Sequence, residues 1–122
     1  MNTEDIKHPQ YGDRECITHL NAVGDALYAI GGKWKLKIII ALFLGKKRFN
    51  ELQRTIDGVS AKVLAAELKE LEMNGFVNRV AYKHKGIAVQ YEATAYCGTL
   101  YDVLNALGEW GNMHREKIRT GF

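Results

Sequence analysis

The 122-residue sequence has little of what disulfide-rich scaffolds and membrane proteins need. It has two cysteines, Cys16 and Cys97, which are too few for a disulfide framework, and a single proline. Its longest apolar run, residues 38–44, is far too short to cross a bilayer. The first residues are polar and acidic and do not resemble a secretory signal. These absences indicate one cytoplasmic domain without membrane contact.

Motifs typical of enzymes and metal sites are also missing. The sequence contains no Gly-rich nucleotide-binding loop, no HExxH and no GxSxG. Its four histidines are scattered, and Cys16 and His19 have ligand-like spacing without a second pair to complete a zinc site. We therefore expect no enzymatic activity, no metal and no cofactor.

The centre of the chain, about residues 50–74, is patterned as two helices around a tight turn. Asn50, with Gln53 three residues later, predicts a helix start, and this helix should run to about Ile56. The pair Asp57-Gly58 admits positive φ and predicts the turn. Such a pair of helices is typical of the helix-turn-helix unit, whose second helix lies in the DNA major groove.

The second of these helices has clear limits and one apolar face. Ser60 is placed to cap its start, and Asn74-Gly75 supplies a left-handed residue to end it. The apolar face is a stripe of three leucines: Leu64, Leu68 and Leu71. The stripe predicts that this helix packs on a core and presents its other side to solvent or DNA.

Two β-rich segments follow at once, residues 76–82 and 87–92, within a predicted wing of about 76–94. The tip between them, residues 83–86, carries two fixed positive charges on Lys83 and Lys85. Residues 47–49 are a candidate third strand. A helix-turn-helix followed by a basic-tipped hairpin is typical of a winged helix, an α+β fold that is mainly α. The alternative is a small α+β core whose basic tip is only solvated surface; the order and spacing favour DNA binding.

The net charge of +3 conceals a segregation of charge along the chain. Residues 33–90 contain 12 Lys and Arg against 5 Asp and Glu, whereas the flanks contain 5 and 9. The basic residues therefore lie in the proposed DNA-binding part, as neutralisation of phosphates requires. The acidic flanks suit protein contacts better.

The flanks are predicted to form two further helices around a buried central one that follows Gly31-Gly32. We expect residues 1–15 to be a flexible arm, a first helix from about Thr18 to Ile30, and a last helix over about 95–118. Their apolar stripes exceed what a core of this size needs and suggest a C2 dimer that sets two recognition helices about 34 Å apart. The alternative is that both stripes close the monomer's own core. The expected interface residues are Leu20, Val23, Leu27, Leu100, Val103, Leu107 and Trp110.

A series of motifs in the right order resembles the HxlR-type winged-helix regulators. The series covers roughly residues 16–114 and consists of Gly31-Gly32-Lys33-Trp34, residues 47–52, Ser60-x-x-Val63-Leu64, Leu68-x-x-Leu71-Glu72-x-x-Gly75-Phe76-Val77-x-Arg79, residues 89–94 and Leu107-x-x-Trp110-Gly111. The resemblance implies one domain over residues 16–122 and a dimeric regulator that binds a promoter palindrome. It also implies a dimer interface built from the first and last helices.

Two segments depart from that family's pattern. The middle of the second helix reads Ala65-Ala66-Glu67, where family members carry larger polar residues such as Thr, Gln or Arg. Alanines offer only small apolar contacts, for example to a thymine methyl, and Glu67 could accept from a cytosine amino group. The wing has residues 83–87 in place of a Pro-Pro-Arg-like run. The scaffold prediction survives both changes, but the operator sequence does not follow from it.

Geometry and charge together select the residues expected to touch DNA. Residues at the start of the second helix and away from its leucine stripe should face the groove, with Lys62 at a guanine or phosphate and Lys69 at the backbone. Arg79 could serve either a phosphate or the packing of the wing. The complete set is Arg48, Asn50, Ser60, Ala61, Lys62, Ala65, Ala66, Lys69, Arg79, Lys83 and Lys85.

Cys16 is a candidate redox sensor. In some HxlR-type regulators a cysteine just ahead of the first helix senses oxidants or electrophiles, and Cys16 stands at that position. Arg14 and the helix start favour a thiolate, whereas Glu15 opposes it. The alternative is a small hydrophobe without a redox role. Cys97, close to Tyr96 and Leu100, is expected to be buried.

The sequence thus predicts a homodimeric transcription regulator that binds double-stranded DNA and represses by occluding a promoter. A small molecule or an oxidant, acting through Cys16, is the expected effector if there is one. The alternative function is a winged-helix module that binds another protein rather than a specific DNA sequence.

Overall fold

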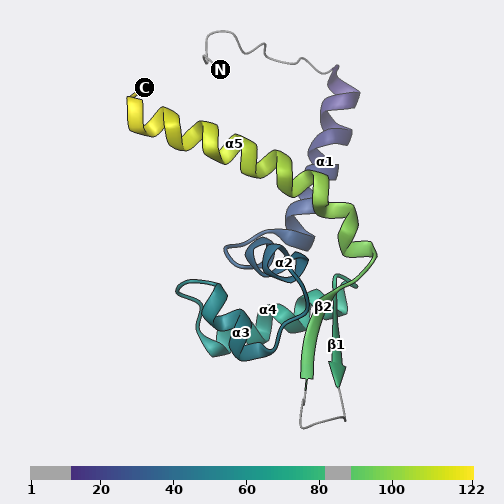
Figure 1. Cartoon of the computed structure of the whole chain (residues 1–122). Coiled ribbons are helices and arrows are strands. Elements are labelled where there is room, and N and C mark those ends of the chain that lie inside the picture. Colours follow the sequence, from purple (N-terminus) through teal and green to yellow (C-terminus); the bar gives the residue numbers. More distant parts are fainter. Residues whose placement is uncertain (1–11, 82–88) are drawn as a thin grey trace.

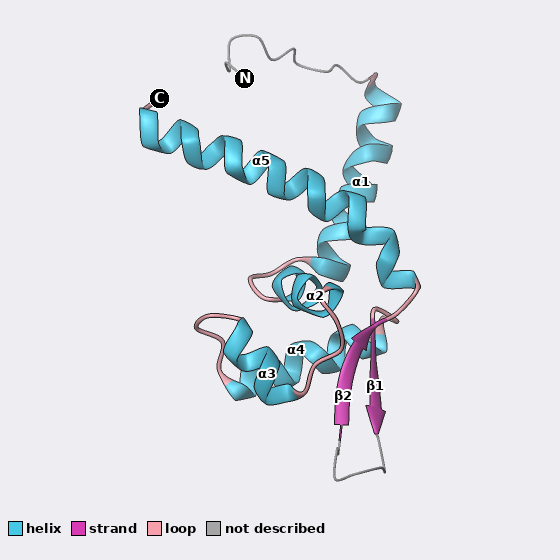
Figure 2. Ribbon diagram, in the orientation of Figure 1, coloured by secondary structure: helices cyan, strands magenta, loops and turns pink. Residues whose placement is uncertain are grey.

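The computed structural model describes residues 12–81 and 89–122. The protein is mainly helical with a small antiparallel sheet, and this described part forms a winged helix-turn-helix (Figures 1 and 2). The elements in chain order are α1 (Asp13–Ile30), α2 (Lys35–Phe43), α3 (Phe49–Thr55), α4 (Ala61–Met73), β1 (Val77–Ala81), β2 (Val89–Ala93), the 3-10 helix η2 (Tyr96–Leu100) and α5 (Tyr101–Thr120). None of these helices is long and apolar enough to cross a membrane.

The core forms where α2, α3, α4 and the sheet meet. The leucine stripe of α4 is fully buried, which confirms the prediction made from its spacing. Ile38 and Ile39 bring α2 into the same core, although Ile40 on the other side of this short helix is half exposed. Leu52 of α3 completes the inner layer. Apolar contacts with α2 and the sheet therefore bury one side of the helix-turn-helix, and its opposite side is exposed to solvent.

The predicted caps and turns of the helix-turn-helix are largely confirmed. The backbone N–H of Val63 donates to Ser60 Oγ at 3.2 Å, so Ser60 caps α4. Gly58 and Gly75 adopt positive φ, at 83° and 81°, where a residue with a Cβ would be strained. The start of α3 was predicted wrongly: the helix begins at Phe49, and Glu51 rather than Gln53 reaches back, accepting from the backbone N–H of Arg48 at 3.0 Å.

The wing is a two-stranded antiparallel sheet in which Val77 pairs with Ala93 and Ala81 with Val89. The third strand expected at residues 47–49 is reduced to one bridge, in which Lys47 and Tyr91 exchange backbone hydrogen bonds of 3.0 and 2.7 Å. It cannot extend because Phe49 already belongs to α3. The predicted hairpin tip lies outside the described residues.

The two flanking helices each touch the core at one end only. α1 begins at Asp13, five residues earlier than predicted, with Asp13 and Glu15 in its first turn, where acidic side chains are favoured. It reaches the core through Ala29 and Ile30, and α5 does so through Leu104, next to Leu100 at the end of η2. Beyond these anchors both helices extend away from the body (Figure 1).

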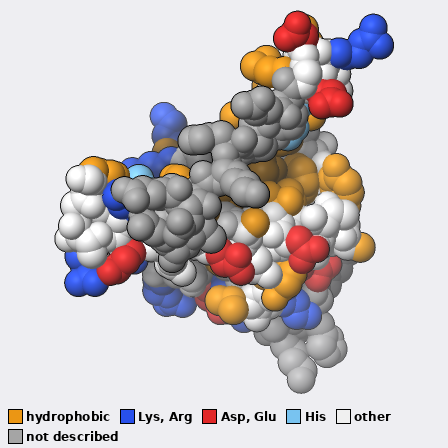
Figure 3. Space-filling view, turned by 90° about the horizontal axis from the view of Figure 1, so that it is seen from above, with side chains coloured by type: hydrophobic (Ala, Val, Ile, Leu, Met, Phe, Trp, Pro, Cys, Tyr) orange, Lys and Arg blue, Asp and Glu red, His pale blue; other side chains and the backbone are white. Residues whose placement is uncertain are grey.

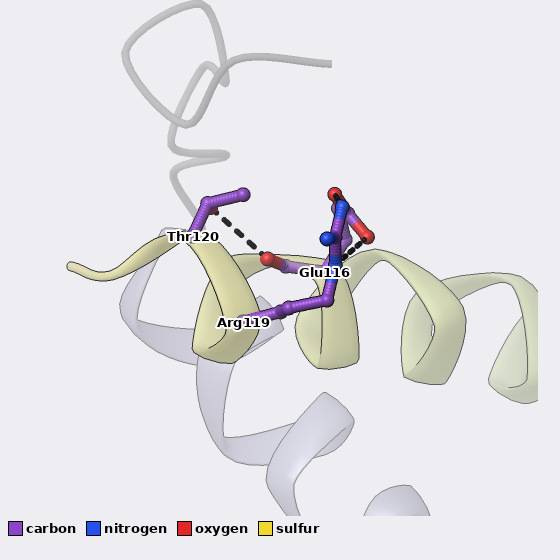
Figure 4. A network of polar contacts seen from close by, with 3 residues as sticks. All are labelled: Glu116, Arg119 and Thr120. Atoms are coloured by element: carbon purple, nitrogen blue, oxygen red, sulfur yellow. Dashed lines mark hydrogen bonds and ion pairs between the residues drawn. The ribbon is translucent and has the colours of Figure 1, made fainter.

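The far end of α5 is solvated. Near the C-terminus Arg119 pairs with Glu116, its Nε donating to Glu116 Oε2 at 3.1 Å, and Thr120 Oγ1 donates to the backbone carbonyl of Glu116 at 3.0 Å (Figure 4). The paired side chains are mostly exposed, so this network adds little to stability. The last helix was expected to start directly after Thr94, but the short 3-10 helix η2 comes before α5. Thr94 fixes the start of η2: its Oγ1 accepts from the backbone N–H of Cys97 and donates to the carbonyl of Gly75.

Candidate nucleic-acid interface

The outward face of α4 carries the residues expected to enter a DNA groove. Because the leucine stripe fixes the rotation of the helix, the opposite side is presented to solvent. Every predicted contact residue of this segment is exposed: Ser60, Ala61, Lys62, Ala65, Ala66 and Lys69. Lys62, Ala66 and Lys69 follow one another at i, i+4 and i+7 and so share one face. In its first turns this face combines lysine side chains with small alanine side chains.

A polar hollow lies between α3 and β2. It is lined by Arg48, Asn50, Glu51, Arg54 and Gln90. Arg48 and Asn50 were expected at a DNA backbone, and both are exposed at this hollow. Its two guanidinium groups make it chemically suited to a phosphate, because Arg forms paired hydrogen bonds to phosphate oxygens.

Arg54 was not among the residues selected from the sequence. The signal that could have found it is its position four residues after Asn50, which puts both side chains on one face of α3. The contribution of β2 through Gln90 could not be foreseen, because it depends on how the sheet packs against α3.

The remaining predicted contacts divide into two groups. Arg79 is exposed on β1, opposite Tyr91 in the strand register, so its side chain is open to solvent. Lys83 and Lys85 lie outside the described residues.

Glu67 is withdrawn from the DNA face, contrary to the expectation that it could read a cytosine. Its carboxylate turns toward α2, where Lys35 Nζ lies 2.7 Å from Glu67 Oε2 and 2.7 Å from Glu70 Oε2. The side chain of Lys35 is 11% exposed, and that of Glu67 is 23% exposed. The hydrogen bonds to Glu67 and then to Glu70 raise the pKa of Lys35, so it remains charged. A direct Glu67 contact to a base would require this ion pair to break.

The apolar stripes of α1 and α5 remain open in the single chain. On α1, Leu20, Val23 and Leu27 are 67%, 44% and 63% exposed, and on α5, Val103, Leu107 and Trp110 are 45%, 48% and 57% exposed. Apolar side chains are visible at the surface when the molecule is seen from above (Figure 3). Leu100 alone among the predicted interface residues is half-buried against the core. The stripes therefore do not close the monomer's own core.

The two cysteines occupy opposite environments. Cys16 was expected just ahead of the first helix, but it lies in the first turn of α1, because this helix already begins at Asp13. It is exposed, and its backbone N–H donates to the carbonyl of Gly12 at 2.8 Å. Cys97 is fully buried in η2, and this burial raises the pKa of its thiol. A thiol that is both buried and protonated is a poor nucleophile. Cys16 is thus the accessible thiol of the described chain.

A winged helix-turn-helix with an open basic face on α4 belongs to the class of DNA-binding transcription regulators. The chain matches the family model described as HxlR-like helix-turn-helix over residues 29–119. The protein belongs to the HxlR family.

Relatives and solved structures agree with this assignment. The chain is 38% identical over 97 residues to the HTH-type transcriptional regulator YtcD of Bacillus subtilis, covering 80% of this chain and 77% of YtcD. The crystal structure of YtcD superposes with a TM-score of 0.72 at 39% identity, covering 77% of this chain and 96% of that one. These relatives are regulators of transcription, and none of them is named as an enzyme.

Two further structures are of regulators whose names concern redox chemistry or quinones. The redox regulator HypR in its reduced form has a TM-score of 0.75 at 34% identity, with 82% of this chain and 99% of that chain covered. The quinone-bound YodB of B. subtilis has a TM-score of 0.64 at 32% identity, with 76% and 98% covered.

Proposed function

We propose that the protein is a homodimeric repressor that binds a palindromic promoter site through α4 and blocks transcription by occlusion. The observation that carries this proposal is the exposed face of α4 that carries Lys62 and Lys69. The hollow lined by Arg48 and Arg54 supports it as a second basic site. The open apolar stripes of α1 and α5 support the dimer, because exposed patches of this kind mark protein interfaces. The names of its relatives support the role in transcription.

The test is fluorescence-anisotropy binding to the DNA that flanks the protein's own gene, with random DNA as control, across a salt series. A sequence-specific regulator should bind the flanking DNA more tightly, and its affinity should fall steeply as salt rises. Binding at one dimer per site is expected. Weak association with a flat salt dependence would instead indicate a module that binds another protein.

Lys62 and Arg54 should contribute differently to this binding. We expect Lys62→Ala to weaken specific binding about tenfold, with a smaller effect on random DNA, because Lys62 is exposed near the start of α4 and is proposed to contact a guanine. Arg54→Ala should weaken both alike and reduce the salt slope, because it lies at the polar hollow suited to a phosphate. The measurement is the same salt series on all three proteins. Parallel losses in both variants would show that Lys62 contacts only phosphate.

An oxidant or electrophile is the effector that the structure supports best. Cys16 is exposed in the first turn of α1, and α1 is a helix of the proposed dimer interface. A modification there can change the angle between the two protomers and hence the distance between their α4 helices. The redox and quinone structures of HypR and YodB support the same type of signal.

Oxidation should therefore act through one cysteine only. Diamide or a benzoquinone is expected to lower operator affinity of the wild type about tenfold or more, an effect within the range of coupling energies between sites. Cys16→Ser should bind DNA normally and ignore the reagent, whereas Cys97→Ser should respond like the wild type because Cys97 is buried. Mass spectrometry of the treated protein locates the modification. An unchanged response in Cys16→Ser would refute the role of Cys16.

A further inference from the structure

The side chains on the DNA face of α4 offer an unusual set of chemical groups. In the described helix, alanines at positions 61, 65 and 66 contribute only methyl groups, and Lys62 and Lys69 contribute only donors. The hydroxyl oxygen of Ser60 already accepts from the backbone of Val63. The exposed face of α4 therefore has few groups that can accept a hydrogen bond from a base.

The two carboxylates in the middle of α4 are both paired with one lysine of α2. Glu67 and Glu70 both lie 2.7 Å from the buried ammonium of Lys35 on α2. Glu67 in particular is mostly buried and on the side of α4 that faces α2. Because Lys35 is itself anchored in the core, it holds the Glu67 carboxylate away from the exposed face, whereas the side chain of Glu70 is 59% exposed.

Base pairs can be sorted by what such a face is able to recognise. In the major groove, guanine presents two acceptors and thymine presents a methyl group beside an acceptor. Cytosine and adenine are distinguished by exocyclic amino groups, which need an acceptor from the protein. A face rich in donors and methyl groups and poor in acceptors therefore favours guanine and thymine.

We infer that α4 selects its half-site by thymine methyl groups packed on Ala65 and Ala66, next to a guanine contacted by Lys62, with Lys35 acting as a positioning residue that withholds Glu67. The inference rests on the proposed DNA-binding function and deepens it. Close approach of the backbone is possible because alanine is small, so the methyl groups of neighbouring thymines can contact Cβ atoms directly. Each contact buries about one methyl group, which corresponds to about a fourfold change in affinity.

The test begins with selection of binding sites from random DNA by the full-length protein. Each thymine of the best site is then replaced singly by deoxyuridine, which removes the C5 methyl and leaves the base pairing intact. We expect about fourfold weaker binding at one or two thymines in each half-site. Deoxyuridine in the flanking sequence is the matched control and should have no effect.

Variants of the protein connect the effect to particular residues. In Ala65→Gly or Ala66→Gly the corresponding deoxyuridine penalty should disappear, and circular dichroism checks that each variant is folded. Ala66→Gln adds both an acceptor and a donor, so repeated selection should now yield adenine at that position.

The outcomes separate the inference from the function on which it rests. A defined consensus whose affinity is unchanged by every deoxyuridine, or a consensus without thymine, overturns the methyl readout while the regulator stands. A selection that yields no consensus overturns both.

Discussion

Replacing Leu107 with glutamate is expected to turn the proposed dimer into a monomer and to lower operator affinity by about 100-fold or more. Leu107 is at the centre of the open stripe of α5, between Val103 and Trp110, and is 48% exposed in the single chain. A charge placed in an apolar interface must be desolvated without a partner, which opposes association. Each monomer then binds one half-site independently, and the gain in affinity that comes from joining two DNA-binding surfaces in one dimer is lost.

Asn105→Glu is the matched control, because it adds the same charge to the opposite side of the same helix. Light scattering at micromolar concentration gives the mass of each variant, and anisotropy gives the affinity for the two-half-site operator. Asn105→Glu should remain dimeric and bind like the wild type. A wild type that is already monomeric, or a Leu107→Glu variant that stays dimeric, would contradict the interface.

Removing the buried ammonium of α2 should cause a large loss of stability. We expect Lys35→Ala to lower the free energy of unfolding by about 2 kcal/mol, because Glu67 is left in a mostly buried position without its counter-charge. This loss of free energy is smaller than that expected for a fully buried ion pair, because the side chains of Glu67 and Glu70 are partly exposed. Urea unfolding at neutral pH measures the change.

A second variant separates the charge from the packing. Lys35→Met combined with Glu67→Gln removes both charges and keeps the volume, so its loss should be clearly smaller than that of Lys35→Ala. Equal losses in the two variants would mean that loss of the ion pair itself, rather than an unpaired Glu67 carboxylate or the lost stem of Lys35, accounts for the effect.

The pH dependence gives an independent check on this ion pair. The pKa of Lys35 is raised above its ordinary value of 10.5 by Glu67 first and Glu70 second. A raised pKa on a basic group means that its stabilising effect is complete below about 10.5 and is lost as pH rises through the folded-state pKa. The stability advantage of the wild type over Lys35→Met/Glu67→Gln should thus shrink as pH rises above that value. A difference that stays constant through this alkaline range would contradict the contribution of the Lys35 charge.

The local features of the helix-turn-helix could be predicted from sequence because they depend on neighbouring residues. The leucine stripe of α4, the Ser60 cap and the positive-φ glycines all follow from helical spacing or from the conformations that a residue can adopt. The family could be identified for a similar reason, because its motifs recur in a fixed order along one chain. The start of α3 was predicted wrongly because two neighbouring pairs of residues have the spacing of a helix cap. Arg48 and Glu51 form the cap, rather than Asn50 and Gln53.

Only the tertiary structure decided what faces outward. Lys35 looks like one more member of a basic cluster in the sequence, yet it is buried because α2 packs against the side of α4 that carries Glu67 and Glu70. The polar hollow likewise unites Arg54 of α3 with Gln90 of β2, residues that are far apart along the chain. The sequence by itself determined which helices form and which side of each is apolar, since both depend on periodicity. The way one helix rotates and docks against another decided which charges are paired internally and which remain free for a partner.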